Sequence, residues 1–358
     1  MNEFVPARAL GNPHLQTIYA PLFRRNAPLS LRRERLTTAD GDFVDLDFLD
    51  GPAGSESAPR LVVLHGLEGS SEAGYVRGML QHAKARGWPA CALNFRSCSG
   101  EDNRRLRSYH SGDTGDLDLV VRTLVAREPA RKLLLCGFSL GGNVTVKWLG
   151  EQGDAPPQQL LRACAISVPF DLSACADALD GPGFWAKIYR ERFLKTLIAK
   201  AHEKAAGHAD EVSAQRLSLA RVDESRTLRE FDDSWTAPVH GFSSAAEYYA
   251  KSSSVNFLPR VRVPLLLISA ADDPFIPASA IPRALVPALP HVRLIETARG
   301  GHVGFVAGSI GAPVYWAEER AAAFLADFAG AVAGDSAGEV VGDSAGEVVG
   351  GPASRTIS

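Results

Sequence analysis

Six short, nearly continuous apolar segments recur along this sequence and constrain its fold more than any other feature. They span 60–66, 89–95, 131–138, 162–168, 264–270 and 292–297. Apolar segments of this length are typical of strands buried on both faces, as in a parallel sheet. Segments with helical periodicity separate the first four, at 71–87, 115–129 and 142–153. This alternation predicts an α/β fold with a doubly wound, mostly parallel sheet. The alternating pattern around an Asp-Gly turn at 31–50 adds an antiparallel hairpin at one edge.

One interval of the chain lacks any buried-strand pattern. From Asp171 to Leu258 the sequence has only helical and polar patterns. This stretch is too long for a plain loop in a compact domain, so we expect a helical cap insertion at about 172–258 over the carboxyl ends of the strands. Its first helix carries the aromatic residues Phe184, Trp185, Tyr189 and Phe193. They fit two roles equally well: lining an apolar substrate pocket, or packing the insertion onto the core.

The carboxyl-terminal residues differ in composition from the rest of the chain. The sequence GDSAGEVV occurs twice in tandem, at 334–341 and 342–349. Small and acidic residues cannot bury enough apolar surface to fold alone. We therefore expect one domain at 1–328 and a low-complexity, disordered tail at 329–358.

Composition excludes several function classes. With a net charge of −3 and 22% charged residues, the chain gives no reason to expect binding to nucleic acids or acidic membranes. No apolar run reaches the ~18 residues of a transmembrane segment, and the amino terminus lacks a signal-peptide pattern. The five cysteines lack metal-ligand spacing, and phosphate-loop and dinucleotide motifs are absent. We expect a cytoplasmic protein with no metal, no cofactor and a small-molecule substrate.

A serine stands at a sharp strand-to-helix turn. The sequence Gly137-Phe138-Ser139-Leu140-Gly141 joins an apolar strand segment to a helical one. Glycines on both sides allow the tight bend of a nucleophile elbow, which exposes the serine hydroxyl. A nucleophilic serine needs a general base, and His302 follows the last strand segment in TARGGHVGF. Ser139 and His302 are therefore the candidate nucleophile and base.

The acid that would orient this histidine should follow the preceding strand. The segment LLLISAADDPFIP ends in Asp272-Asp273-Pro274, which is also a turn signal. We prefer Asp273 as the acid and Asp272 as a turn or cap residue, although the sequence separates the two only weakly. Asp171 is a further candidate, but its position favours a helix N-cap. The order serine, aspartate, histidine is that of triads built on open α/β sheets.

An oxyanion site requires backbone N–H groups that point at the developing charge. We expect one from Leu140, at the amino terminus of the helix after Ser139. The second should come from Leu67, in the loop HGLEGSS that follows the first apolar segment. His65 in this loop fits a buried residue that bonds loop backbone. Glu68 fits a solvated or loop-positioning role.

Several stretches together resemble the YheT-type α/β-hydrolases. In chain order they are GNPHLQTIYAPLFRR, HGLEGSS, NFRSCSG, YHSGDTGDL, GFSLGGN, FDDSWTAPVHGFSSAAEYY, ADDPFIP and GGHVGF. The chain departs from the family pattern at Ser97, where glycine is usual, and at Tyr19, where tryptophan is expected. In the first stretch, Asn12 and Pro13 should begin a helix that packs around the core without a chemical role.

The resemblance implies the α/β-hydrolase fold and a Ser-Asp-His triad, which falls on Ser139, Asp273 and His302. It also implies a serine carboxylesterase that cleaves esters through an acyl-enzyme. Short- to medium-chain acyl esters or monoacylglycerols are the expected substrates, and acyl hydrolysis of lipids or phospholipids is the alternative. A noncatalytic binding protein on the same fold is an alternative of another class.

Overall fold

The computed structural model describes residues 3–327 of the chain. Its centre is an eight-stranded sheet with the strand order β1-β2-β4-β3-β5-β6-β7-β8. The expected tail at 329–358 lies outside the described residues. The strands are β1 (Arg32–Thr37), β2 (Phe43–Leu49), β3 (Arg60–Leu64), β4 (Ala90–Asn94), β5 (Leu133–Phe138), β6 (Leu160–Ile166), β7 (Leu265–Ala270) and β8 (Val292–Thr297).

The sheet confirms the α/β fold that the apolar segments predict. In the sheet order from β4 to β8 all neighbouring strands are parallel, and each is joined to the next along the chain by a crossover connection. Only β2 runs against the other strands, and it pairs antiparallel with β1 and β4 at the edge where the Asp-Gly pattern predicts a hairpin. Each of the six apolar segments forms a strand, with bounds within two residues of those expected. Every residue of β3, β4, β5 and β7 is buried, as expected of strands that are covered on both faces.

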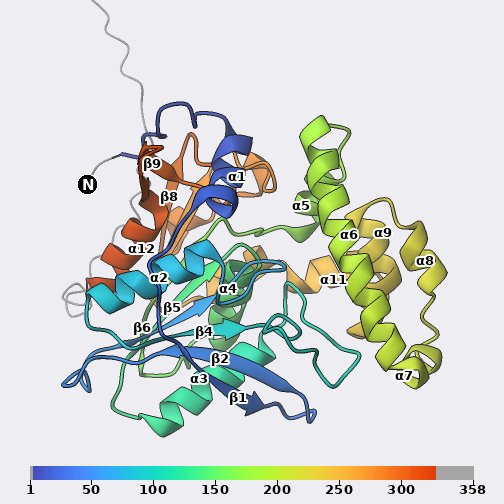
Figure 1. Ribbon diagram of the computed structural model, residues 1–358, viewed down its shortest axis with the longest axis horizontal. Helices are drawn as coiled ribbons and strands as arrows, with labels where there is room; N and C mark the ends of the chain where they lie inside the picture. Colours follow the sequence, from blue (N-terminus) through green and yellow to red (C-terminus); the bar gives the residue numbers. More distant parts are fainter. Residues whose placement is uncertain (1–2, 328–358) are drawn as a thin grey trace, which may run out of the picture.

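Helices cover both faces of the sheet (Figure 1). On one face α2 (Gly74–Ala85) and α12 (Trp316–Ala326) pack their apolar residues against the strands. On the other face α3 (Gly115–Arg127) and α4 (Leu140–Gln152) do so. Because the strands are parallel, their carboxyl ends gather at one edge, and the loops that leave this edge carry the candidate site residues.

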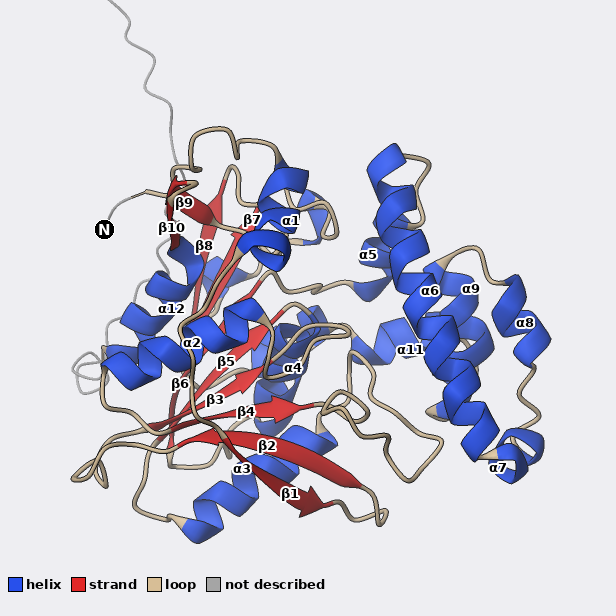
Figure 2. Cartoon of the chain, viewed as in Figure 1, coloured by secondary structure: helices blue, strands red, loops and turns tan. Residues whose placement is uncertain are grey.

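The interval before β7 forms a helical layer beside the sheet (Figure 2). Its own buried cluster includes Tyr189, Leu194, Val222 and Trp235. The helices are α5 (Leu172–Leu179), α6 (Phe184–Gly207), α7 (Ala209–Ala214), α8 (Leu219–Glu224), α9 (Leu228–Phe231), α10 (Ala237–Val239) and α11 (Ala245–Ser252). A π-helical turn covers Asp232–Thr236, and short 3-10 turns cover Ser254–Asn256, Leu258–Arg260, Ala278–Ala280 and Val286–Ala288. We call the part from α5 to α11 the cap.

The amino-terminal segment packs against the end of the domain. Helix α1 (Pro13–Phe23) begins as the sequence predicts, because the Asn12 side chain accepts hydrogen bonds from the N–H groups of His14 and Leu15. A hairpin of β9 (Val306–Ser309) and β10 (Ala312–Tyr315), which the sequence pattern does not indicate, lies next to it. Tyr19 is buried there, and its hydroxyl donates to the Ile310 carbonyl at 2.9 Å.

The backbone conformation at Ser97 shows why glycine is usual at this position. Its φ is 59°, in the left-handed region that side chains rarely adopt. Asn103 holds the loop in this conformation, because its Oδ1 accepts from the Ser97 N–H at 2.5 Å. The loop therefore keeps a glycine-like backbone with a serine in it.

Candidate active site

Ser139 occupies the turn between β5 and α4 with a strained backbone. Its φ and ψ are 51° and −120°, which a non-glycine residue rarely adopts. The surrounding structure maintains this strain: the Ser139 N–H donates to the Ile166 carbonyl of β6 at 2.8 Å. The geometry is that of the nucleophile elbow expected from the sequence.

The two glycines of the elbow are required by close packing. A Cβ on Gly137 would overlap the Gly141 carbonyl, and a Cβ on Gly141 would overlap the backbone of Leu64 and His65. Helix α4 therefore starts in contact with the end of β3. This contact brings the loop after β3 beside Ser139, since a Cβ on Gly66 would lie 3.1 Å from that of Ser139.

Ser139, His302 and Asp273 form a continuous hydrogen-bonded chain. His302 Nε2 lies 2.8 Å from Ser139 Oγ, and His302 Nδ1 lies 2.9 Å from Asp273 Oδ2. The carboxylate can only accept, so Nδ1 carries the proton and Nε2 is free to accept from the serine hydroxyl. The Asp273 side chain is 1% exposed and that of His302 is 10% exposed, so the hydrogen bond between them is shielded from water.

The two neighbouring aspartates have different partners. Asp273 also accepts from the N–H groups of Phe275 and Ile276, at 2.8 and 3.2 Å, which fix its carboxylate. Asp272 instead accepts from the Gly301 N–H at 2.9 Å, and burial raises its pKa. Asp171 caps α5 by accepting from the Ala174 N–H, in agreement with its expected structural role.

Three consecutive N–H groups hold the loop that carries His302. That of Gly301 donates to Asp272, that of His302 donates to Thr17 Oγ1 at 2.9 Å, and that of Val303 donates to Ser167 Oγ at 3.0 Å. Sequence reasoning missed Thr17 and Ser167. Thr17 belongs to the segment that was expected to pack without a chemical role, yet it directly contacts the backbone of the candidate base. The only available signal was its place in a stretch that resembles the family.

The loop after β3 is held in one conformation by buried polar groups. His65 is wholly buried, which lowers its pKa to about 4. Its Nε2 accepts from the Phe95 N–H at 3.1 Å, so its Nδ1–H donates to the Gly66 carbonyl at 2.7 Å. This confirms the structural role expected for His65. The Tyr75 hydroxyl accepts from the Gly66 N–H, and the Tyr109 hydroxyl accepts from the Glu68 N–H, both at 2.9 Å.

Between these two fixed N–H groups lies that of Leu67. Among the described residues, neither Leu67 nor Leu140 donates its backbone N–H to a protein acceptor. Both groups are therefore available near Ser139, at the end of β3 and at the amino terminus of α4. An unused pair of donors beside a half-buried serine is what an oxyanion site requires.

Glu68 connects this loop to the cap. Its carboxylate accepts from Lys200 Nζ of α6, at 3.0 Å to Oε1 and 2.9 Å to Oε2. The Tyr109 hydroxyl also donates to Oε1 at 3.1 Å. The carboxylate therefore faces Lys200 and Tyr109.

The cap aromatics differ in how they relate to this site. The rings of Tyr189 and Phe193 pack edge-on against Phe275, with centroids 4.7 and 5.7 Å away, and Phe275 lies 4.4 Å from the His302 ring. Trp185 stacks on His14 of α1 at 4.5 Å. Phe184 is 71% exposed, and its one ring contact is with Trp185. Because its ring is mostly exposed, Phe184 is the least suited of the four to line a pocket.

Within residues 3–327, no cluster of His, Cys, Asp or Glu has the arrangement of a metal site. The described helices include none that is long and apolar enough to cross a bilayer.

Comparisons with known proteins agree with the fold. The family model described as "alpha/beta hydrolase fold" matches residues 59–309. The protein of Escherichia coli (strain K12) named "Putative esterase YheT" is 40% identical over 89% of this chain and 91% of its own length. Mouse phospholipase ABHD3 is 30% identical over 82% of this chain and 71% of its own length. The monoacylglycerol lipase of Saccharomyces cerevisiae is 31% identical over 70% of this chain and 55% of its own length.

Among solved structures, the Pyrococcus furiosus esterase Pf2001 superposes with a TM-score of 0.52. It is 18% identical, and the match covers 85% of this chain and 93% of the esterase. At this level of identity the likeness concerns the fold alone.

Proposed function

This chain belongs to the YheT-type alpha/beta hydrolase family, and on that premise we propose that it is a serine hydrolase of carboxylic esters. Ser139 is the nucleophile, His302 the general base and Asp273 the residue that orients the base. The observation that carries the proposal is the 2.8 Å contact between Ser139 Oγ and His302 Nε2, continued at 2.9 Å to Asp273.

In the first half of the reaction Ser139 Oγ attacks the ester carbonyl, and its proton moves to His302 Nε2. The imidazolium is stabilised by Asp273, which accepts the Nδ1–H. When the bond between carbonyl carbon and alkoxy oxygen breaks, His302 returns the proton to the leaving alcohol. An acyl-enzyme on Ser139 remains.

In the second half a water molecule gives its proton to His302 and attacks the acyl-enzyme. The bond to Ser139 Oγ breaks, the serine regains its proton, and the carboxylic acid leaves. In both halves the tetrahedral oxyanion accepts hydrogen bonds from the N–H groups of Leu67 and Leu140. The position of Leu140 at the start of α4 adds the favourable field of the helix amino terminus.

The aromatic residues beside the triad favour a substrate with an apolar acyl chain. Phe275 lies against His302, and Tyr189 and Phe193 pack on Phe275, so the wall next to the base is aromatic. We expect short- to medium-chain acyl esters or monoacylglycerols as substrates, which makes the protein an acylglycerol lipase-like carboxylesterase. The names of the relatives, a phospholipase and a monoacylglycerol lipase, favour lipid esters and make phospholipids the second candidate.

A fluorophosphonate probe tests the proposal directly. The wild-type chain should be labelled covalently and should hydrolyse p-nitrophenyl butyrate. Ser139→Ala should lose both properties with an unchanged melting temperature, because the acyl-enzyme would have no oxygen on which to form. If a folded wild-type chain were neither labelled nor active, a noncatalytic binding role on this fold would replace the proposal.

A further inference from the structure

Large apolar side chains are exposed mainly at one end of the molecule. Eight such side chains are exposed among the described residues, and all but Leu285 belong to the amino-terminal segment, the start of α6 or the β9–β10 turn. We call these seven the apolar rim. They are Val5, Leu15, Leu22, Phe23, Phe184, Ile188 and Ile310.

The three parts of the rim are neighbours in space. Tyr19 joins α1 to the hairpin, because its ring lies 5.4 Å from that of Phe23 and its hydroxyl donates to Ile310. His14 joins α1 to α6 by stacking on Trp185, which Phe184 contacts in turn. Figure 1 shows α1, β9 and the first turns of α6 at the same, upper end of the molecule.

Three apolar side chains of helix α1 are exposed to solvent. Leu15 and Leu22 lie seven positions apart on the same face of the helix, and Leu22 and Phe23 are each 65% exposed. The buried residues Gln16 and Tyr19 hold the helix to the domain, and Gln16 bonds to the Val306 backbone. Large apolar side chains left exposed together on one helix mark an interaction surface.

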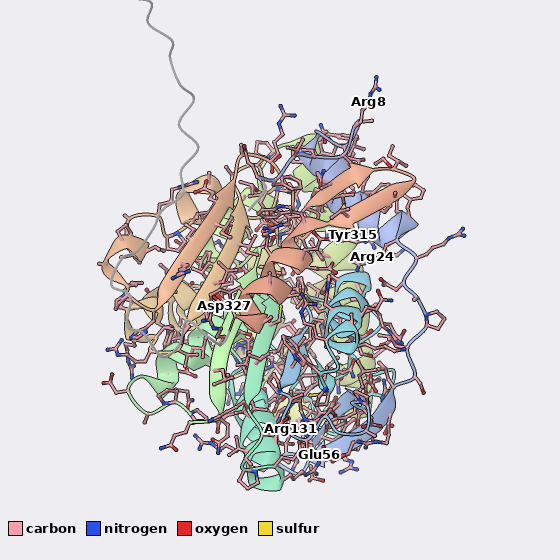
Figure 3. The ribbon with its side chains drawn as sticks, turned by 90° about the vertical axis from the view of Figure 1, so that its left-hand side faces the viewer. Arg8, Arg24, Glu56, Arg131, Tyr315 and Asp327 are labelled. Carbon is pink, nitrogen blue, oxygen red and sulfur yellow. The ribbon has the colours of Figure 1, made fainter. Side chains whose placement is uncertain are left out.

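Exposed basic side chains outnumber acidic ones on the segments that carry the rim and in the loop of Arg299. Acidic ones on the same segments are Glu3 and Glu191, and the latter lies 3.7 Å from Lys187. Figure 3 shows Arg8 pointing away from the body of the molecule at this end. The exposed basic residues are Arg8, Arg25, Lys187, Arg192 and Arg299. This end is thus locally basic, although the net charge of the chain is −3.

We propose that this end of the molecule docks on an anionic phospholipid surface, with the apolar rim entering the lipid and the basic residues contacting the headgroups. Apolar residues flanked by Arg and Lys are the pattern of interfacial membrane binding. A second copy of this chain fits less well, because a two-fold interface would set each patch of basic residues against its own copy.

The location of the rim relates docking to the proposed function, on which this part of the inference rests. The helix that carries Leu22 and Phe23 also holds the His302 loop through Thr17. A membrane bound to the rim therefore lies next to the candidate triad, where esters from the lipid phase would arrive. Lipid esters rather than freely dissolved ones are then the substrate class of this site.

Vesicle sedimentation tests the docking with the full-length protein. It should bind vesicles of phosphatidylcholine mixed equally with phosphatidylglycerol, and bind less as salt is raised. Leu22→Ser combined with Phe23→Ser should weaken binding about tenfold, since both side chains would leave the lipid. Arg8→Glu combined with Arg25→Glu should remove the preference over pure phosphatidylcholine vesicles.

Matched controls separate docking from folding and from chemistry. Leu285→Ser makes the same chemical change outside the rim and should bind as wild type. The rim variants should keep the wild-type melting temperature and should hydrolyse soluble p-nitrophenyl butyrate at the wild-type rate. Ser139→Ala should bind vesicles normally, so loss of the proposed function and loss of docking are distinguishable.

Three results would overturn the docking proposal: no binding of wild type to either vesicle, wild-type binding by the Leu22→Ser, Phe23→Ser variant, or a dimer that this variant dissociates. The last result would identify a second copy of the chain as the occupant of the rim.

Discussion

Thr17 Oγ1 accepts a hydrogen bond from the backbone N–H of His302 at 2.9 Å, across 285 positions of sequence. The same hydroxyl donates to the Pro13 carbonyl at 2.8 Å, so its lone pair is directed at the loop. Helix α1 thereby fixes the backbone from which the candidate base projects.

Thr17→Val should therefore lower kcat while leaving KM nearly unchanged. Valine keeps the shape of threonine but leaves the half-buried His302 N–H without its acceptor, which costs up to about 1–3 kcal/mol. Thr17→Ser keeps the hydroxyl and is the matched control. The measurement is kcat and KM of each variant for p-nitrophenyl butyrate, compared at an equal fraction of folded protein. Equal kcat for the valine and serine variants would contradict a positioning role.

Substitutions of the two neighbouring aspartates should have very different effects on kcat. Asp273→Asn should reduce kcat by several orders of magnitude, since an amide cannot both accept the Nδ1–H and stabilise the imidazolium. Asp272→Asn should have a small effect, because the amide oxygen can still accept from the Gly301 N–H. The reverse ranking of the two kcat values would transfer the orienting role to Asp272.

Chain-length preference should depend on the aromatic residues next to His302. For wild type, kcat/KM should rise from p-nitrophenyl acetate to the butyrate or hexanoate, by up to about 0.8 kcal/mol per methylene buried. Phe193→Ala should flatten this rise because it removes a ring that packs on Phe275. Phe184→Ala removes a 71% exposed ring and should leave the profile intact. A profile that is unchanged in both variants would assign Phe193 to packing alone.

The ion pair between Lys200 and Glu68 should couple the cap to the loop that carries Leu67. Lys200→Met keeps the apolar stem and removes the charge, so we expect kcat/KM to fall by a factor of about three to ten as the loop loses this restraint. Lys195→Met, at an exposed position of the same helix, is the control. Activity of Lys200→Met equal to that of the control would show that the ion pair does not act on the loop.

Stability should decrease as the pH falls below the ordinary range of histidine. Burial lowers the pKa of His65 from 6.5 to about 4 and that of His110 to about 3. Between pH 6.5 and the lowered pKa of each histidine, that histidine binds a proton in the unfolded chain but stays neutral in the folded chain. The contribution of these two histidines to the free energy of unfolding is therefore largest above pH 6.5. Below that pH it falls, by up to about 1.4 kcal/mol per pH unit for each histidine.

Urea unfolding at pH 7, 6 and 5 measures this slope, and His110→Gln, which does not titrate, should reduce it. An equal slope for the wild-type chain and for His110→Gln would contradict a neutral, buried His110.

Much of the fold could be predicted because its strands are buried on both faces. Such strands need nearly continuous apolar segments, and β3 to β7 are visible in the sequence for that reason. The β9–β10 hairpin could not be predicted, because its short strands contain a single buried residue and leave no apolar pattern. Ser139 could be singled out because the elbow needs glycines at 137 and 141, which leave a local pattern.

The sequence by itself determined the layered α/β architecture and the candidate residues Ser139, Asp273 and His302, because their patterns depend on near neighbours in the chain. Only the tertiary structure decided between Asp272 and Asp273 as the hydrogen-bonding partner of His302. It also revealed Thr17 and Ser167 behind the His302 loop and gathered the apolar rim from three distant segments. Hydrogen bonds and surface patches join residues hundreds of positions apart, and a contact set by folding leaves no periodic pattern from which it could be read.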